Sequence, residues 1–494
     1  MRINNLTILP FVPSITQPNP KKPNPMKTQQ PKIGILALTL ELYETLAPGV
    51  REDREQWLHR DVLPALARFV DVEFQSAVYS ASGIRAEVNR LEQSGVDAIA
   101  VMMLTYAPSE LAVAPLKSTR VPLIVWNIQE LFAVDENYDA DALLKNHGVH
   151  GTQDLANVLV RCAVPFEYVT SHMQDANACE EVVDFTYAAF ARRQIALSRF
   201  GLFGTAFPGM GDFAVDTMQW GAQFGCGWTT LSIEEYIHRA ETMGDQQVRA
   251  LVNDYQNSYD IASDITEADL DQTARAELAL RSLVDENHLA GFTYLFTSFG
   301  DDERTSTVPF VAASRMMAEG YGFGGEGDLI STMATRMFHL LRPPVSFSEI
   351  FTTDYGGNAV FLSHMGEANV AMARKDRKPP LVARPAPITR TKNRQLALVT
   401  TFEPGDATLA ALVQCRNGWR LITALIQIED YGPLPSLCSP HSKAKVPGDV
   451  RQFLTDYAKA GGTHHNALFV GDARAKLRVL ATLTNMDYVE LTDH

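Results

Sequence analysis

The segment IGILAL (residues 33–38) is a short, uninterrupted apolar run, and the helical pattern of residues 52–69 follows it. Two similar runs, AIAVM (98–102) and PLIVW (122–126), come after further helical segments. Apolar runs of this length, separated by amphipathic helices, are typical of strands buried in a parallel sheet. The chain from residue 33 onwards therefore predicts a doubly wound α/β domain, whose ligands would bind beyond the carboxyl ends of the strands.

A second α/β unit follows the first. It opens at RFGLFG (residues 199–204), continues through a helix-rich, acidic stretch (232–287) and includes a strand over 291–296. After about residue 359 the pattern changes to strand-like segments such as 396–400, which are separated by loops rich in proline, glycine and aspartate. Such a pattern favours a β-rich domain. We therefore expect two open-sheet, Rossmann-like α/β domains followed by a β-rich, barrel-like C-terminal domain.

These patterns also suggest domain boundaries. The N-terminal α/β domain would cover residues 31–190, the central α/β domain 191–355 and the C-terminal domain 356–494. Residues 1–30 contain the proline-rich run QPNPKKPNP, which fits neither a helix nor a sheet ladder. We expect them to form a disordered extension, with Met26 as an alternative start of the chain.

The composition of this 494-residue chain limits its class. A net charge of −15, with no stripe of lysine and arginine to offset it, argues against a nucleic-acid partner. No apolar run approaches the roughly 20 residues that span a bilayer, so we expect no membrane insertion. The five cysteines are widely spaced, which is typical of free thiols in a reducing compartment. We therefore expect a cytoplasmic protein.

Four short polar segments in the last third of the chain are typical of one metal site. They supply two carboxylates and two imidazoles, flanked by glycine or apolar residues. This mixture of oxygen and nitrogen ligands suits an octahedral ion with two open positions, for which Mn²⁺ is the best candidate. A structural zinc site would more often use thiolates. The segments are GYGFGGEGD (320–328), SFSE (346–349), LSHMGE (362–367) and AGGTHHN (460–466), and the candidate ligands are Glu326, Glu349, His364 and one of His464 and His465.

Each of these segments also has an ordinary structural explanation. The glycine run could be a loop that leads into a helix capped by Asp328. Glu349 could face solvent from an alternating strand, and His364 could be a hydrogen-bonded residue at the end of the strand 359–362. The metal hypothesis therefore depends on the four segments taken together.

The same segments resemble the L-arabinose isomerase family, within the wider arabinose and fucose isomerase group. The resemblance rests on residues 320–328, on the triplet SHM (363–365) and on the turn GGTHH (461–465). It extends upstream to NHGVHGTQD (146–154), which is similar to the family's sugar-binding segment, and to VTSH (169–172). The likeness therefore covers most of the chain.

The resemblance implies an aldose–ketose isomerase that uses one Mn²⁺ ion per active site and acts on an L-arabinose-like pentose or a deoxyhexose. It implies that two of the ligands, Glu326 and Glu349, also form an acid–base pair that moves a proton between C1 and C2. A homo-oligomer, a trimer or a hexamer, with the active site near a subunit boundary is implied as well. The implied metal ligands are Glu326, Glu349, His364 and His465, and the implied sugar-binding residues are His150 and His464.

Three segments depart from the family pattern where the far end of the sugar should bind. They are LTLELY (38–43), FPGMGDF (207–213) and residues 350–358. They indicate a divergent branch and leave the sugar less well defined than the metal chemistry. Two alternatives stay open: a sugar-binding or regulatory protein with two α/β domains around a cleft, and an epimerase that uses the same metal site.

Overall fold

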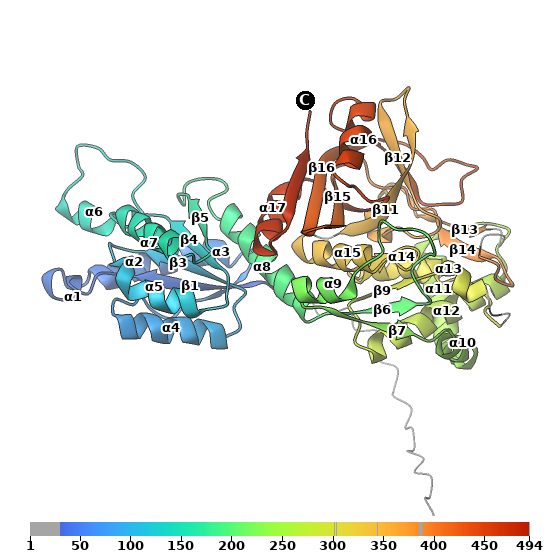
Figure 1. Ribbon diagram of the computed structural model, residues 1–494, viewed down its shortest axis with the longest axis horizontal. Coiled ribbons are helices and arrows are strands. Elements are labelled where there is room, and N and C mark those ends of the chain that lie inside the picture. Colours follow the sequence, from blue (N-terminus) through green and yellow to red (C-terminus); the bar gives the residue numbers. More distant parts are fainter. Residues whose placement is uncertain (1–29, 301, 303, 343, 385–388, 494) are drawn as a thin grey trace, which may run out of the picture.

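The protein has three parts: an α/β domain at one end, a long helix that leads to a second α/β domain, and a β-barrel packed on that second domain (Figure 1). The predicted disordered extension, residues 1–30, lies outside the described residues except for its last residue. The computed structural model describes residues 30–300, 302, 304–342, 344–384 and 389–493.

The N-terminal domain is built on a five-stranded parallel sheet with the order β2-β1-β3-β4-β5. Its central strands are the apolar runs that the sequence predicts, and every residue of β3 is buried. The order reverses at β1, so the neighbouring loops after β1 and β3 open a crevice there. The strands are β1 (Lys32–Leu38), β2 (Asp71–Glu73), β3 (Ala98–Met103), β4 (Leu123–Asn127) and β5 (Glu167–Thr170).

Helices cover both faces of this sheet, because both faces carry apolar side chains. One face packs against α2 (Val50–Trp57), η1 (Leu58–Val62), α3 (Leu63–Leu66) and α8 (Glu180–Ala196). The other face packs against α4 (Ala81–Gln93), α5 (Ser109–Ser118) and α7 (Val149–Arg161). Two short helices, α1 (Tyr43–Leu46) and α6 (Ala140–Lys145), complete the domain.

The central domain has a four-stranded parallel sheet with the order β10-β9-β6-β7. Apolar side chains of α10, α12 and α14 pack on one face, and those of α8, α9 and α15 on the other. Strand β10 lies inside the glycine run, where the sequence predicts only a loop. The elements are β6 (Arg199–Phe203), α9 (Thr217–Phe224), β7 (Gly227–Leu231), α10 (Ile233–Thr242), α11 (Asp245–Ser258), α12 (Glu267–Glu286), β9 (Gly291–Tyr294), α13 (Phe296–Gly300), α14 (Phe310–Ala318), β10 (Gly322–Gly324) and α15 (Leu329–Leu341).

The C-terminal region is a closed antiparallel barrel. Its strands follow the order β15-β18-β11-β12-β17-β16, and β15 pairs with β16 to close the ring, while β19 adds to β16 in parallel. Two helices, α16 and α17, pack against the strands. The elements are β11 (Val345–Asp354), β12 (Ala359–Ser363), β15 (Gly405–Cys415), β16 (Gly418–Ile428), β17 (His441–Lys445), α16 (Val450–Lys459), β18 (His465–Val470), α17 (Arg474–Leu483) and β19 (Asp487–Leu491).

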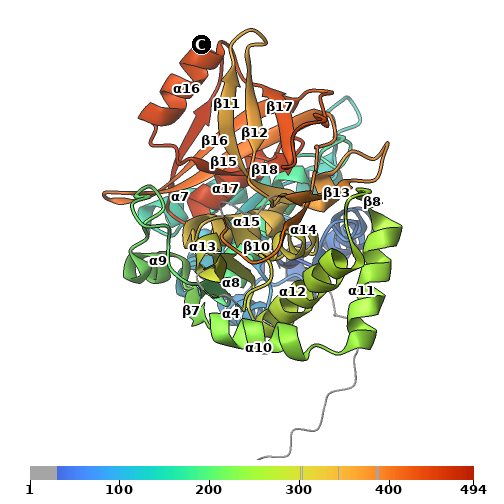
Figure 2. The same cartoon turned by 90° about the vertical axis from the view of Figure 1, so that its right-hand side faces the viewer.

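Helix α15 joins the barrel to the central sheet. Its Leu329 and Met333 belong to one apolar cluster with Phe200 of β6 and with Ala410 and Phe469 of the barrel. Figure 2, seen at right angles to Figure 1, also has α15 between the barrel strands and β10. The first residues of this helix therefore lie where the two parts meet.

The predicted fold class is confirmed: two parallel-sheet α/β domains precede a barrel. The domain boundaries stay a prediction, although β11, which precedes residue 356, already pairs within the barrel. The strand predicted over 396–400 is not a barrel strand. It is β14 (Gln395–Leu398), which pairs with β13 (Pro380–Arg384) in a small sheet that β8 (Asp260–Ile261) completes. One turn of 3₁₀-helix, η2 (Val370–Met372), precedes β13.

Two further observations bear on the composition. Among the described residues, no helix has both the length and the apolar character that a membrane crossing requires. All five cysteines are free thiols, as their spacing predicts.

Candidate metal centre

Glu326 lies in the tight loop between β10 and α15. Its φ of 53° and the φ of 82° at Gly327 are both in the left-handed region. Glycine adopts this conformation freely, whereas for a residue with a side chain it costs roughly 1–2 kcal/mol. The loop keeps this shape because Gly327 packs against the carbonyl oxygen of Thr205, with no room for a Cβ, and the Phe207 amide donates to the Glu326 carbonyl at 2.9 Å. Strain of this kind at a charged residue indicates a functional role.

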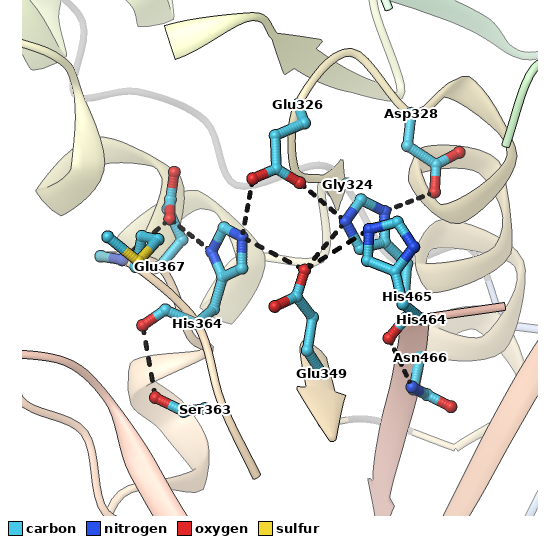
Figure 3. A network of polar contacts seen from close by, with 12 residues as sticks. Gly324, Glu326, Asp328, Glu349, Ser363, His364, Glu367, His464, His465 and Asn466 are labelled. Atoms are coloured by element: carbon cyan, nitrogen blue, oxygen red, sulfur yellow. Dashed lines mark hydrogen bonds and ion pairs between the residues drawn. The ribbon is translucent and has the colours of Figure 1, made fainter. Parts of the chain in front are cut away.

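The register of the barrel brings the other candidates together. Strand β11 pairs Glu349 with His465 of β18 on one side and with Ser363 of β12 on the other. His364 follows Ser363 directly. Because paired residues have Cβ atoms about 5 Å apart, the side chains of one row can converge on one point. Figure 3 shows Glu326, Glu349 and the imidazoles doing so.

His465 is fully buried, and carboxylates contact both of its nitrogens. Its Nδ1 is 2.8 Å from Oδ2 of Asp328, and its Nε2 is 2.9 Å from Oε2 of Glu326 and 3.1 Å from Oε1 of Glu349. The ring of Phe213 stacks on the imidazole with a centroid distance of 4.9 Å. Asp328 therefore fixes one edge of the ring, and the other edge faces the cluster.

His364 is buried on the opposite side of the cluster. Its Nδ1 is 2.7 Å from Oε2 of Glu367. Its Nε2 is buried and has no hydrogen-bond partner among the described residues. A Cβ on Gly325 would lie 2.9 Å from this nitrogen, so only glycine leaves room for the ring. The edge of Phe347 packs against both imidazoles, at centroid distances of 4.7 Å from His364 and 4.8 Å from His465.

His464 lies at the exposed rim of the same cluster. Its Nδ1 and its backbone amide both contact Oδ2 of Asp212, at 2.6 and 3.0 Å. Its Nε2 is 3.9 Å from Oε1 of Glu349. His465, the first residue of β18, and His464, which directly precedes the strand, therefore both point toward the cluster, one from within the protein and the other from its surface.

The spacing of these atoms fits a six-coordinate ion. Bonds of about 2.1 Å put neighbouring ligand atoms about 3.0 Å apart and opposite ones about 4.2 Å apart. The two contacts of His465 Nε2, 2.9 and 3.1 Å, match the first value. His364 Nε2 is farther away, at 4.0 Å from Oε1 of Glu326 and 3.9 Å from Oε1 of Glu349, which is between the two values. One ligand atom from each of Glu326, Glu349, His464 and His465 lies within 4.8 Å of the others, a group in which His464 stands in the place of the predicted ligand His364.

Comparisons with known proteins identify the family of this chain. The family model for the L-arabinose isomerase central domain matches residues 209–342, and the model for the L-arabinose isomerase C-terminal domain matches residues 344–487. Together they cover more than half of the chain. The chain belongs to the L-arabinose isomerase family. It is therefore an isomerase, an intramolecular oxidoreductase of the aldose–ketose type.

Full-length relatives of this family are similar over most of their length. The L-arabinose isomerase of Nocardioides sp. is 27% identical over 400 residues, which is 78% of each chain. That of Acidothermus cellulolyticus is 25% identical over 88% of each chain, and that of Thermotoga maritima is 25% identical over 75%. These identities are low for one family, as expected of a divergent member.

The carboxylates and imidazoles of the cluster shift one another's pKa values. Burial would raise the pKa of Glu326, but the hydrogen bond from His465 and the nearby imidazoles lower it overall. Burial would likewise lower the pKa of His465, but its hydrogen bonds, that to Asp328 first, raise this pKa well above its usual value. The pKa of His364 is raised by Glu367 against the same effect of burial. Without an ion, the cluster therefore holds protons where a cation would bind.

His150, the predicted sugar-binding residue, is not part of the cluster. It lies in the first turn of α7, in the N-terminal domain, and its ring stacks on Tyr106 at 4.9 Å and contacts His147 at 5.3 Å. In Figure 1 this domain and the barrel lie on opposite sides of α8. The role of His150 therefore stays a prediction.

Sequence reasoning gave no role at the site to several residues that contact the ligands. Asp328 was expected only as a helix cap, and Glu367 and Asp212 lie in quoted segments without a function of their own. A usable signal was spacing, because Asp328 follows Glu326 by two positions and Glu367 follows His364 by three. Phe213 and Phe347, which pack on the imidazoles, carried no such signal.

Proposed function

We propose that this isomerase requires a divalent ion, with Mn²⁺ as the natural metal and an L-arabinose-like pentose or a deoxyhexose as the substrate. The observation that carries the proposal is the convergence of Glu326, Glu349, His364 and His465 at separations suited to one ion. Oxygen and imidazole donors with open positions favour Mn²⁺ over a structural zinc. A bound ion would act as a Lewis acid toward the sugar oxygens and stabilise negative charge on the enediolate.

The proton transfer is assigned to the two glutamates. Isomerisation removes a proton from the carbon next to the carbonyl and adds one to the neighbouring carbon. Glu326 is assigned the role of base, because its carboxylate faces the cluster and the hydrogen bond from His465 favours its ionised form. Glu349 faces the same space from the barrel and would serve as its partner. The rings of Phe213 and Phe347 pack on the imidazole of His465 at this side of the site.

Sugar binding is assigned to two histidines on different domains. Nε2 of His464 lies at the exposed rim of the cluster, where it could contact a hydroxyl group. His150 is too remote to serve the site of its own chain, so we assign it to the site of a neighbouring copy in a trimer or hexamer.

The decisive test is a panel of aldoses and ketoses incubated with the Mn²⁺-loaded protein in deuterated water and followed by NMR. The expected result is isomerisation of one pentose or deoxyhexose with deuterium at C1 or C2. Product without deuterium would favour a hydride shift, and an inverted centre without a ketose would favour the epimerase alternative. The Glu349→Gln variant should lose about 10²–10⁴-fold in turnover. Full turnover in this variant would contradict the acid–base assignment.

A further inference from the structure

Glu367 is a buried carboxylate with an unusual set of partners. Its side chain is 1% exposed. Oε2 accepts hydrogen bonds from Nδ1 of His364 at 2.7 Å and from the amide of Gly366 at 3.1 Å, and Oε1 accepts one from the hydroxyl of Tyr294 at 2.5 Å. None of these hydrogen-bonding partners is a lysine or an arginine, and the guanidinium of Arg384 interacts with the carboxylate without a direct hydrogen bond. Burying a charged carboxylate is costly unless it is hydrogen-bonded and paired with an opposite charge. The position of Glu367 therefore calls for an explanation.

The hydrogen bond to Glu367 determines how His364 faces the cluster. An imidazole that donates from Nδ1 keeps the lone pair on Nε2, and this is the atom that can bind a metal. Figure 3 shows Glu367 on the side of the ring away from Glu349, with Nε2 toward the cluster. The same relation recurs at His465, whose Nδ1 contacts Asp328 at 2.8 Å. Carboxylates behind metal-binding histidines orient the ring and raise its basicity.

We propose that Glu367 is the positioning residue for His364, and that Tyr294 holds Glu367 in place. The inference rests on the proposed metal site. Tyr294 belongs to β9 of the central domain, whereas His364 and Glu367 follow β12 of the barrel. The tyrosine hydroxyl therefore ties the orientation of a barrel histidine to the central sheet. Glu367 touches neither the ion nor the sugar in this role.

Three variants of the full-length protein test the proposal: Glu367→Ala, Glu367→Gln and Tyr294→Phe. The first readout is the Mn²⁺ dissociation constant, measured from the EPR signal of free Mn²⁺. We expect Glu367→Ala to bind about 10- to 100-fold more weakly. Glu367→Gln keeps an acceptor for Nδ1 but loses the charge, so its loss should be smaller. Tyr294→Phe should also weaken binding, because Glu367 is then less constrained.

The second readout is the tautomer of the neutral His364 imidazole in the metal-free protein, from ¹⁵N NMR of histidine-labelled samples at a pH high enough to remove the imidazolium form. Wild type and Glu367→Gln should carry the proton on Nδ1, and Glu367→Ala should lose this preference. A merely structural role for Glu367 would not change the tautomer. If Glu367→Ala fails to fold, the Mn²⁺ affinities of Glu367→Gln and Tyr294→Phe still test the proposal.

The matched control is Tyr255→Phe, which removes another buried hydroxyl that donates to a buried glutamate, Glu277, at 2.8 Å. It should bind Mn²⁺ like wild type. Wild-type Mn²⁺ affinity in Glu367→Gln and Tyr294→Phe, together with an unchanged tautomer in Glu367→Ala, would overturn the proposal. If wild-type protein binds no Mn²⁺, the proposed function fails, and the tautomer measurement alone then judges the role of Glu367.

Discussion

The loop around Glu326 shows how single residues set the geometry of the site. A glutamate in the left-handed region is held there by its neighbours: Gly327 fits against Thr205, and Gly325 leaves space for His364. Larger residues at either glycine would move the carboxylate or the imidazole. The glycine run therefore serves close packing around the cluster as well as chain flexibility.

Gly327→Ala should destabilise the fold and weaken Mn²⁺ binding, because the new Cβ would collide with the carbonyl oxygen of Thr205 at a φ of 82°. The matched control is Gly49→Ala, which has a φ of 94° but nothing within 4 Å of the added Cβ. We expect the control to lose only the backbone cost of roughly 1–2 kcal/mol and to keep its metal affinity. Thermal unfolding and Mn²⁺ titration measure the two effects. Equal losses in both variants would show that the contact with Thr205 is unimportant.

Metal affinity should depend on pH through His465. Its pKa is raised well above the usual value, so at neutral pH the metal-free protein carries a proton there that a bound ion must displace. Lower pH increases this competition, so the Mn²⁺ dissociation constant should rise as the pH falls from 8 to 6, and binding should release protons. Titrations at several pH values, with proton release recorded in weak buffer, check both statements. An affinity that is constant over this range would refute the competition.

At the scale of elements, the sequence predicts which strands exist better than how they pair. The helix capped by Asp328, the strand that contains Glu349 and the strand before His364 follow from local patterns. The pairing of Glu349 with His465 joins residues more than a hundred positions apart, and such registers leave no local trace. Strand β10 escapes prediction because glycine disfavours strands, and β14 has the pattern of a barrel strand although it pairs elsewhere.

Asp328 has two roles, one in helix α15 and one in the cluster. Its side chain caps α15 by accepting a hydrogen bond from the Ser331 amide at 2.9 Å, and it also contacts His465. Asp328→Asn should keep the cap, since asparagine is an equally good N-cap residue, but lose the charge behind the imidazole. We expect a nearly unchanged melting temperature with weaker Mn²⁺ binding. Asp449→Asn, at the N-cap of α16, is the matched control and should change neither quantity. A large loss of stability in Asp328→Asn alone would assign the residue mainly to folding.

At the scale of the whole molecule, the three-part architecture is predictable because each part has its own hydrophobic pattern. The relative placement of the parts is not, since it depends on contacts such as those of α15 with both the central sheet and the barrel. The separation of His150 from the cluster is likewise not predictable, because it depends on how the N-terminal domain is placed relative to the barrel. Local motifs identify residues of a site without saying which copy of the chain they serve.

Mixing two inactive variants tests the proposed assembly. If His150 serves a neighbouring copy, oligomers formed from coexpressed Glu349→Gln and His150→Ala chains should contain some intact sites and regain activity. The control pair, Glu326→Gln with Glu349→Gln, leaves every site defective and should stay inactive. Turnover of the substrate found by NMR, together with light scattering of the mixture, gives the answer. Mixed oligomers without regained activity would confine each site to one chain.

The candidate metal ligands are divided between the central domain and the barrel, and this division limits how the two parts can change independently. Glu326 belongs to the segment matched by one family model, residues 209–342, whereas Glu349, His364 and His465 belong to the segment matched by the other, residues 344–487. Neither half carries a complete set of candidate ligands. In a chimaera with the barrel of a relative, the site would stay intact only under one condition. The loop that carries Glu326 would have to lie at the same position relative to the barrel strands that carry Glu349 and His465. A change that moves the ligands of one half therefore needs a matching change in the other half if the four side chains are to stay together.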